Sequence, residues 1–240
     1  ADMKTPGESA TDILEDIKAR VMPEITSKYA TVTPLYEGQN REAKKTIDSV
    51  KIIGPIILIL IYLVIAFTFR SYSQPILLIL LIPFSMIGVV WGHYFHNFSI
   101  GILSWLGIIA LIGIMVNDGL VLIGKFNTYL KEGMKYDEAL IQAGKSRFRA
   151  IVLTSLTTIA GLAPLLLEKS RQAQFLKPMA ISISYGIAVA TILTLVLLPL
   201  LLSVSNQLKV VLKWLKTGKK VTQEEVERAI IESKFVHDEE

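Results

Sequence analysis

The stretch Ser99–Gly124, SIGILSWLGIIALIGIMVNDGLVLIG, decides the fold of this chain. Coiled at about 1.5 Å per residue, it predicts a helix of roughly 39 Å, long enough to cross a bilayer with tilt. Asp118, beside Asn117, is the acidic residue inside this apolar run. A carboxylate in hydrocarbon costs at least about 2.5–3.5 kcal/mol, so an ionisable group there indicates a functional site. The position points towards proton- or ion-coupled transport.

Four further apolar runs accompany this one, and 52% of the 240 residues are hydrophobic. Because the apolar residues are bunched into long blocks, the sequence predicts a mainly α, polytopic membrane protein with five transmembrane helices. Pro164 and Pro199 lie inside two of these runs and are expected to kink them. The transmembrane domain is predicted at 49–205, with helices at about 52–69, 75–95, 99–124, 150–167 and 178–204.

Residues 1–48 are predicted to be the end of a small α/β domain. Apolar residues at helical spacing between Ala10 and Val21 predict a helix that Pro23 perturbs or ends. Residues 31–37 read as a short strand, an edge strand because of Pro34. Since this polar segment runs directly into the first span, we expect the C-terminal part of a longer protein.

Two polar segments follow membrane spans. Residues 125–149 form an amphipathic segment, which is predicted to be helical and to lie along the cytoplasmic membrane surface. Residues 206–240 comprise a basic amphipathic stretch, Gln207–Lys216, and a charged tail to which no function is assigned. The basic stretch fits either a solvated flank that stops translocation or a lipid-binding helix.

The charges of the connecting segments predict the orientation. Most of their lysines and arginines lie in 125–149 and after 205, whereas the 96–98 turn has none. The positive-inside rule therefore places the N-terminal domain outside the cytoplasm and the C-terminus inside. The net charge of +4 reflects this topology and gives no indication of nucleic-acid binding.

The sequence argues for a transporter and against an enzyme. It has no cysteine, so neither a disulfide framework nor a thiolate metal site is expected. Its three histidines are not spaced as a metal cluster, and no nucleophile–base pair stands out. No metal site and no cofactor are therefore predicted.

Small and polar residues of the third and fourth spans are the candidate functional positions. Gly113 and Gly119 are expected to allow close helix packing. Asn117 fits either a hydrogen-bonding role between helices or a functional one. The hydroxyl groups of the fourth span, including Thr154 and Thr158, are expected mostly to bond the carbonyl four residues earlier. One such pair could instead line a hydrated path.

Four motifs in order resemble resistance-nodulation-division (RND) efflux permeases of the hydrophobe/amphiphile, acriflavine resistance protein B-like kind. GIMVNDGLVL at Gly113–Leu122 is similar to the tenth-helix motif, and 139–156 is similar to the loop into the eleventh helix. Phe69–Pro75 and Leu35–Gln39 resemble the link between helices eight and nine and the end of the periplasmic porter domain. The five spans would then be equivalent to spans 8–12.

The resemblance implies a proton relay of Asp118, Asn117, Thr154 and Arg147. In such permeases, paired fourth-helix aspartates meet a tenth-helix polar residue, often lysine, and an arginine and a threonine of the eleventh helix complete the relay. Asn117 stands at the lysine position, which puts simple charge-pair switching in doubt. Asn-Asn and Asn-Asp variants of this motif also belong to the pattern of the family.

The resemblance further implies a homotrimeric, multi-pass protein of the bacterial inner membrane, driven by the proton motive force. Its partners would be the N-terminal half of the same permease, a periplasmic adaptor, an outer-membrane channel and the lipid bilayer. The expected substrates are amphiphilic drugs and other toxic compounds. Two alternatives remain open at this point: a heavy-metal cation exporter of the same fold, and a non-transporting membrane scaffold or protein-export accessory.

Overall fold

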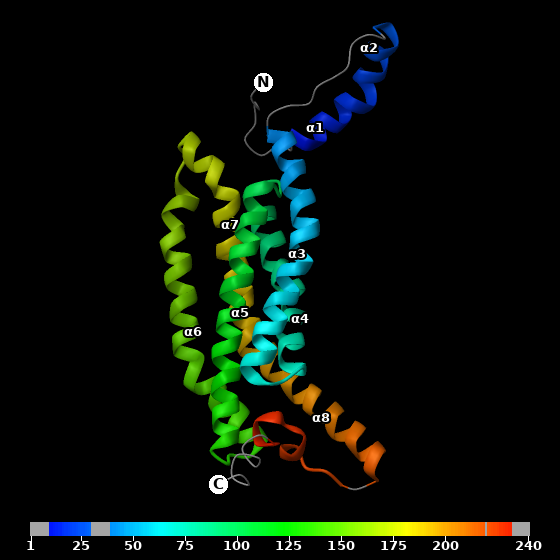
Figure 1. Cartoon of the computed structure of the whole chain (residues 1–240). Coiled ribbons are helices and arrows are strands. Elements are labelled where there is room, and N and C mark those ends of the chain that lie inside the picture. Colours follow the sequence, from blue (N-terminus) through cyan, green and yellow to red (C-terminus); the bar gives the residue numbers. More distant parts are fainter. Residues whose placement is uncertain (1–9, 30–38, 219, 232–240) are drawn as a thin grey trace.

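The computed structural model describes residues 10–29, 39–218 and 220–231, and within them the protein is a bundle of long helices (Figure 1). Five helical stretches in these ranges are long and apolar enough to cross a membrane, which confirms the five predicted spans. The elements are α3 (Gln39–Phe69), α4 (Ser73–His96), α5 (Ile102–Lys131), α6 (Tyr136–Leu167), α7 (Arg171–Ile192) and α8 (Leu198–Thr217).

Helix α7 is the central element of the bundle. It packs against α4, α5 and α6, while α3 and α6 lie on opposite flanks (Figure 1). The core between the helices is formed by fully buried aliphatic and aromatic side chains. The largest of them include Leu81, Leu111, Leu122, Ile123 and Phe126. By contrast, α3 leaves most of its apolar side chains exposed, as a membrane-facing helix does.

Glycines allow α4 and α5 to approach the backbone of α7. A Cβ atom at Gly88 would collide with the carbonyl oxygen of Tyr185. A Cβ atom at Gly107 would lie 2.7 Å from the carbonyl oxygen of Met179. Helices in lipid associate through such close packing, because the hydrophobic effect does not drive apolar helices together there.

The amino-terminal segment is helical where it is described. Helix α1 (Ala10–Asp16), a π-helical stretch (Ile17–Val21) and α2 (Met22–Lys28) follow one another. Pro23 lies in the first turn of α2, where a missing N–H group costs least, so it follows a perturbed stretch and does not end the helix. The predicted strand at 31–37 lies outside the described residues, and the α/β character of this domain stays a prediction.

The boundaries around the 125–149 segment differ from the predicted ones. This segment is helical, as expected, but it is not a separate element, because α5 continues to Lys131 and α6 already begins at Tyr136. Only the turn 132–135 separates the two helices, and Gly133 in it has a φ of +86°. Helix α5 begins at Ile102 and not at Ser99, since the backbone of Gly101 is extended and its N–H donates to the Ser104 hydroxyl.

The kink expected at Pro199 coincides with a change of helix type. A π-helical stretch, Leu193–Leu197, joins α7 to α8, and Pro199 follows in the first turn of α8. Proline has no N–H group for the normal hydrogen-bond ladder, and a local π-helical adjustment can satisfy the backbone groups that it frees in a membrane helix. Beyond this point α8 leaves the bundle obliquely (Figure 1).

We predict that Gly88→Ala destabilises the protein by about 1–3 kcal/mol, because the added methyl group meets the Tyr185 backbone, which cannot turn aside, as well as the Val189 side chain. The matched control is Gly161→Ala, where a Cβ atom would have no neighbour within 4 Å. Thermal unfolding of the full-length protein in detergent measures both. Equal midpoints for the two variants would contradict the assigned α4–α7 contact.

Candidate functional site: an acid within the bundle

Asp118 lies in the middle of α5 and is 8% exposed. The neighbouring Gly119 faces a Leu78 methyl group of α4, which occupies the space that a Cβ atom would take, and a Leu198 methyl group of α8 at ordinary contact distance. In the part of the chain that the structure describes, no hydrogen bond or ion pair engages the Asp118 carboxylate. The acid is thus held between apolar helices.

The other three predicted relay residues occupy different environments. Asn117 is exposed, and Thr154 is exposed with its hydroxyl donated to the carbonyl of Ala150 at 2.8 Å. Arg147 is partly buried, and its Nε atom is buried without a partner among the described residues. Helices α5 and α6 pack together, but no hydrogen bond or ion pair within the described ranges joins any two of Asp118, Asn117, Arg147 and Thr154. The relay therefore stays a prediction.

The hydroxyl groups of α6 follow the expected local pattern. Thr157 and Thr158 donate to the carbonyls of Leu153 and Thr154, each at 2.9 Å. Ser155 likewise donates to the carbonyl of Ile151 at 2.9 Å, and its hydroxyl also lies 2.6 Å from that of Thr191 on α7. The expectation of back-bonding is confirmed, and the hydroxyl that connects two helices is that of Ser155.

The two glycines expected to serve helix packing behave differently. A Cβ atom at Gly119 would collide with the Leu78 side chain, so α5 and α4 lie close together there, and the packing role of Gly119 stays a prediction. At Gly113 a Cβ atom would have no neighbour within 4 Å among the described residues, so no close helix contact is seen there and its packing role also stays a prediction. Gly113 instead borders an apolar groove of about 570 Å³ between α3, α4 and α5. The groove is also lined by Ile53, Ile57, Ile82, Trp105 and Ile109.

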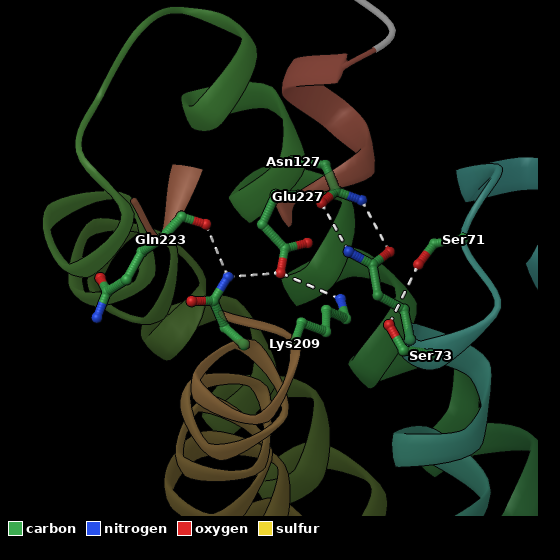
Figure 2. Close-up of polar contacts among 8 residues, drawn as sticks. Ser71, Ser73, Asn127, Lys209, Gln223 and Glu227 are labelled. Atoms are coloured by element: carbon green, nitrogen blue, oxygen red, sulfur yellow. Dashed lines mark hydrogen bonds and ion pairs between the residues drawn. The ribbon is translucent and has the colours of Figure 1, made fainter. Parts of the chain in front are cut away.

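A buried amide pair that the sequence analysis missed joins α4 to α5. Gln74 Nε2 donates to Asn127 Oδ1 at 2.9 Å, and Asn127 Nδ2 donates to Gln74 Oε1 at 3.0 Å. The two side chains are 2% and 7% exposed, and Figure 2 shows Asn127 in this pair. The signal was two amides near the ends of neighbouring apolar runs, but their pairing depends on the tertiary structure.

A second missed contact joins α4 to α7 at the opposite end of the bundle. His93, 4% exposed, has its Nδ1 atom 3.1 Å from the carbonyl oxygen of Phe98 and its Nε2 atom 3.0 Å from the Ser182 hydroxyl. His96 Nε2 lies 3.1 Å from the Tyr185 hydroxyl. Polar contacts thus fix α4 at both ends, while the acid lies between them on α5.

A polytopic helical bundle with an acid buried on one of its helices is typical of membrane transporters that couple ions to movement. A sequence model of the AcrB/AcrD/AcrF family matches residues 4–205, and the chain belongs to this family. Two crystal forms of a heavy metal efflux pump have the same fold, with TM-scores of 0.69 and 0.66 at 23% identity. The first alignment covers 84% of this chain and 20% of that one.

Several curated relatives align with the chain over only part of their own length. Swarming motility protein SwrC of Bacillus subtilis (strain 168) is 33% identical over 146 residues, which are 60% of this chain and 14% of SwrC. Multidrug resistance protein MdtC of Proteus mirabilis (strain HI4320) is 27% identical over 71% of this chain and 17% of its own. Nickel and cobalt resistance protein CnrA of Cupriavidus metallidurans is 27% identical over 81% of this chain and 18% of CnrA.

We predict that Gln74→Leu destabilises the protein more than the double change Gln74→Leu with Asn127→Leu. The single change leaves a buried amide unpaired, whereas the double change removes both polar groups. A double-mutant cycle of unfolding free energies should give a coupling of about 0.6–1.7 kcal/mol. Additive effects of the two single changes would show that the amide pair does not form.

Proposed function

We propose that the chain is the C-terminal part of a proton-coupled efflux transporter, with Asp118 as the proton-binding residue of this part. The observation that carries the proposal is the burial of this acid on α5, in a chain that belongs to a family of efflux permeases. A carboxyl group in such surroundings is costly to charge, so its protonation can change with its partners and with conformation.

The neighbouring helices give protonation a mechanical consequence. Gly119 keeps α5 close to Leu78 of α4 and Leu198 of α8. A charge on the preceding residue requires hydration or a cation, whereas the neutral acid tolerates dry packing. Loading and release of a proton would therefore favour different arrangements of these helices. In the proposed relay, Arg147 would be the cation of α6, with Asn117 and Thr154 providing polar partners.

The orientation and partners belong to the same proposal. We place the protein in the bacterial inner membrane, with α1 and α2 on the periplasmic side and the turn 132–135 on the cytoplasmic side. Helices α1 and α2 lie beyond one end of the bundle, and the turn 132–135 lies at the other end (Figure 1). The N-terminal half of the permease would carry the remaining proton-binding residues. Three such complete subunits, with a periplasmic adaptor and an outer-membrane channel, would form the pump.

We predict that Asp118→Asn abolishes proton-dependent efflux, because the amide keeps the shape of the acid but does not ionise. The matched control is Asp137→Asn, which removes an exposed carboxylate of α6 and should leave efflux unchanged. Efflux from cells expressing the full-length protein, with and without a dissipated pH gradient, measures the effect. Unchanged efflux in the Asp118 variant would overturn its role.

The proposed substrates are amphiphilic toxic compounds, and the apolar groove between α3, α4 and α5 supports this choice because it is exposed along membrane-facing helices. A heavy-metal cation is the second candidate, supported by the similarity to CnrA and to the heavy metal efflux pump. The methionines of this chain, soft ligands that metal export could use, are scattered along it.

Growth of a deletion strain complemented with the full-length gene distinguishes these substrates. Export of amphiphiles predicts restored resistance to dyes and detergents, and export of metals predicts restored resistance to nickel, cobalt or other transition metals. Gly113→Leu places a large side chain in the groove, and it should reduce resistance only if the protein exports amphiphiles. No restored resistance to either class would favour a non-transporting scaffold.

A further inference from the structure

The outer part of α8 carries two adjoining stripes. This helix continues the last membrane span, Gln172–Thr217, and departs obliquely from the bundle (Figure 1). Leu208, Leu212 and Leu215 share one face and are 59%, 59% and 66% exposed. Lysines at a spacing of four and three residues form the adjoining basic stripe: Lys209, Lys213 and Lys216.

The acidic segment after α8 folds back onto this basic stripe. Glu227, 3% exposed, accepts hydrogen bonds from Asn206 Nδ2 at 2.8 Å and from Lys209 Nζ at 3.2 Å (Figure 2). Lys213 Nζ donates to the backbone carbonyl of Glu225 at 3.1 Å. The segment thus occupies two of the three lysines and leaves the apolar stripe uncovered.

A second anchor holds the same segment against α6. The Tyr136 backbone N–H, in the first turn of α6, donates to Glu224 Oε1 at 3.1 Å. This hydrogen bond lowers the pKa of the Glu224 carboxyl, which therefore stays charged, as suits a group at a helix N-terminus. Ala229 is buried in the core cluster, so the segment docks through apolar contacts as well.

We propose that the lysine stripe of α8 is a binding surface for anionic lipid headgroups, and that the segment Glu224–Glu227 is its built-in competitor. An exposed apolar stripe beside lysines, on a helix that leaves a membrane span, fits the boundary between headgroups and acyl chains. Phosphate groups there would present the same kind of partner to Lys209 as the Glu227 carboxylate does. Lipid and segment therefore exclude each other at this lysine.

The ion pair between Lys209 and Glu227 is suited to reversible competition. Lys209 remains 29% exposed in its ion pair with Glu227, so water can reach the pair and a headgroup can replace the carboxylate. Salt weakens attraction between partly exposed charges, so both competing contacts depend on ionic strength. The local density of anionic lipid would then decide whether the segment braces α6 against α8 or releases them.

Trp214, in the same part of α8, provides the probe. The full-length protein is placed in nanodiscs of phosphatidylcholine that contain either dansyl-phosphatidylglycerol or dansyl-phosphatidylcholine. Energy transfer from Trp214 is isolated by subtracting the signal of Trp214→Phe. Glu227→Gln keeps an acceptor for Asn206 but removes the competing charge. It should raise the preference for the anionic probe roughly two- to fivefold over the wild type.

Two controls make the result specific. Glu225→Gln removes the same charge from an exposed side chain of the segment and should leave the preference near that of the wild type. Lys209→Gln together with Lys213→Gln should abolish the preference. If Glu227→Gln fails to fold, a chain ending at Gly218 removes the competitor altogether and should behave in the same way.

Two outcomes would overturn the proposal. Equal preference in the wild type and in the variants without the competitor would show that the segment does not compete with lipid. Absence of Trp214 energy transfer to either probe would show that another protein surface covers α8. Neither outcome depends on proton coupling at Asp118, so this test is independent of the proposed transport function.

Discussion

The close approach of α7 to its neighbours is the constraint on which the rest of the bundle depends. In lipid, apolar side chains gain no hydrophobic stabilisation when they leave the acyl chains for a helix interface. Helices therefore associate where their surfaces fit and where polar groups pair. Gly88 of α4 and Gly107 of α5 bring those helices against the α7 backbone. The Ser155–Thr191 contact attaches α6 to the same helix. The position of Asp118 between helices follows from this arrangement.

Polar pairs then fix the bundle at its two ends without placing charge in its middle. His93 connects α4 to α7 at one end, and Gln74 pairs with Asn127 at the other. Neutral hydrogen bonds of this kind avoid the desolvation cost that a buried ion pair would carry. Asp118, without a partner in the described part of the chain, is therefore the exception among buried side chains of α5.

Sequence reasoning predicted those features that depend on composition along a single element. Runs of apolar residues identified the five spans, because hydrocarbon leaves the backbone few alternatives to a helix. The boundary at 125–149 was misplaced because charge marks a membrane surface but does not end a helix. Spacing likewise could not show that Gly119 lies against Leu78 whereas Gly113 borders a groove, since both are on α5 and only the neighbouring helices distinguish them.

The same limit explains why the tail after α8 seemed featureless. A segment with Glu224, Glu225 and Glu227 reads as solvated charge, and its burial becomes intelligible only with Lys209 and the start of α6 in place. Once docked, it adds a further connection between α6 and α8, which also contact each other directly. Helix α6 carries Arg147 and Thr154, whereas α8 contributes the Leu198 methyl group beside Gly119. The docked segment therefore restrains both α6, which carries two residues of the proposed relay, and α8, which packs beside Gly119. If protonation of Asp118 moves α6 relative to α8, the segment after α8 must either move with them or undock.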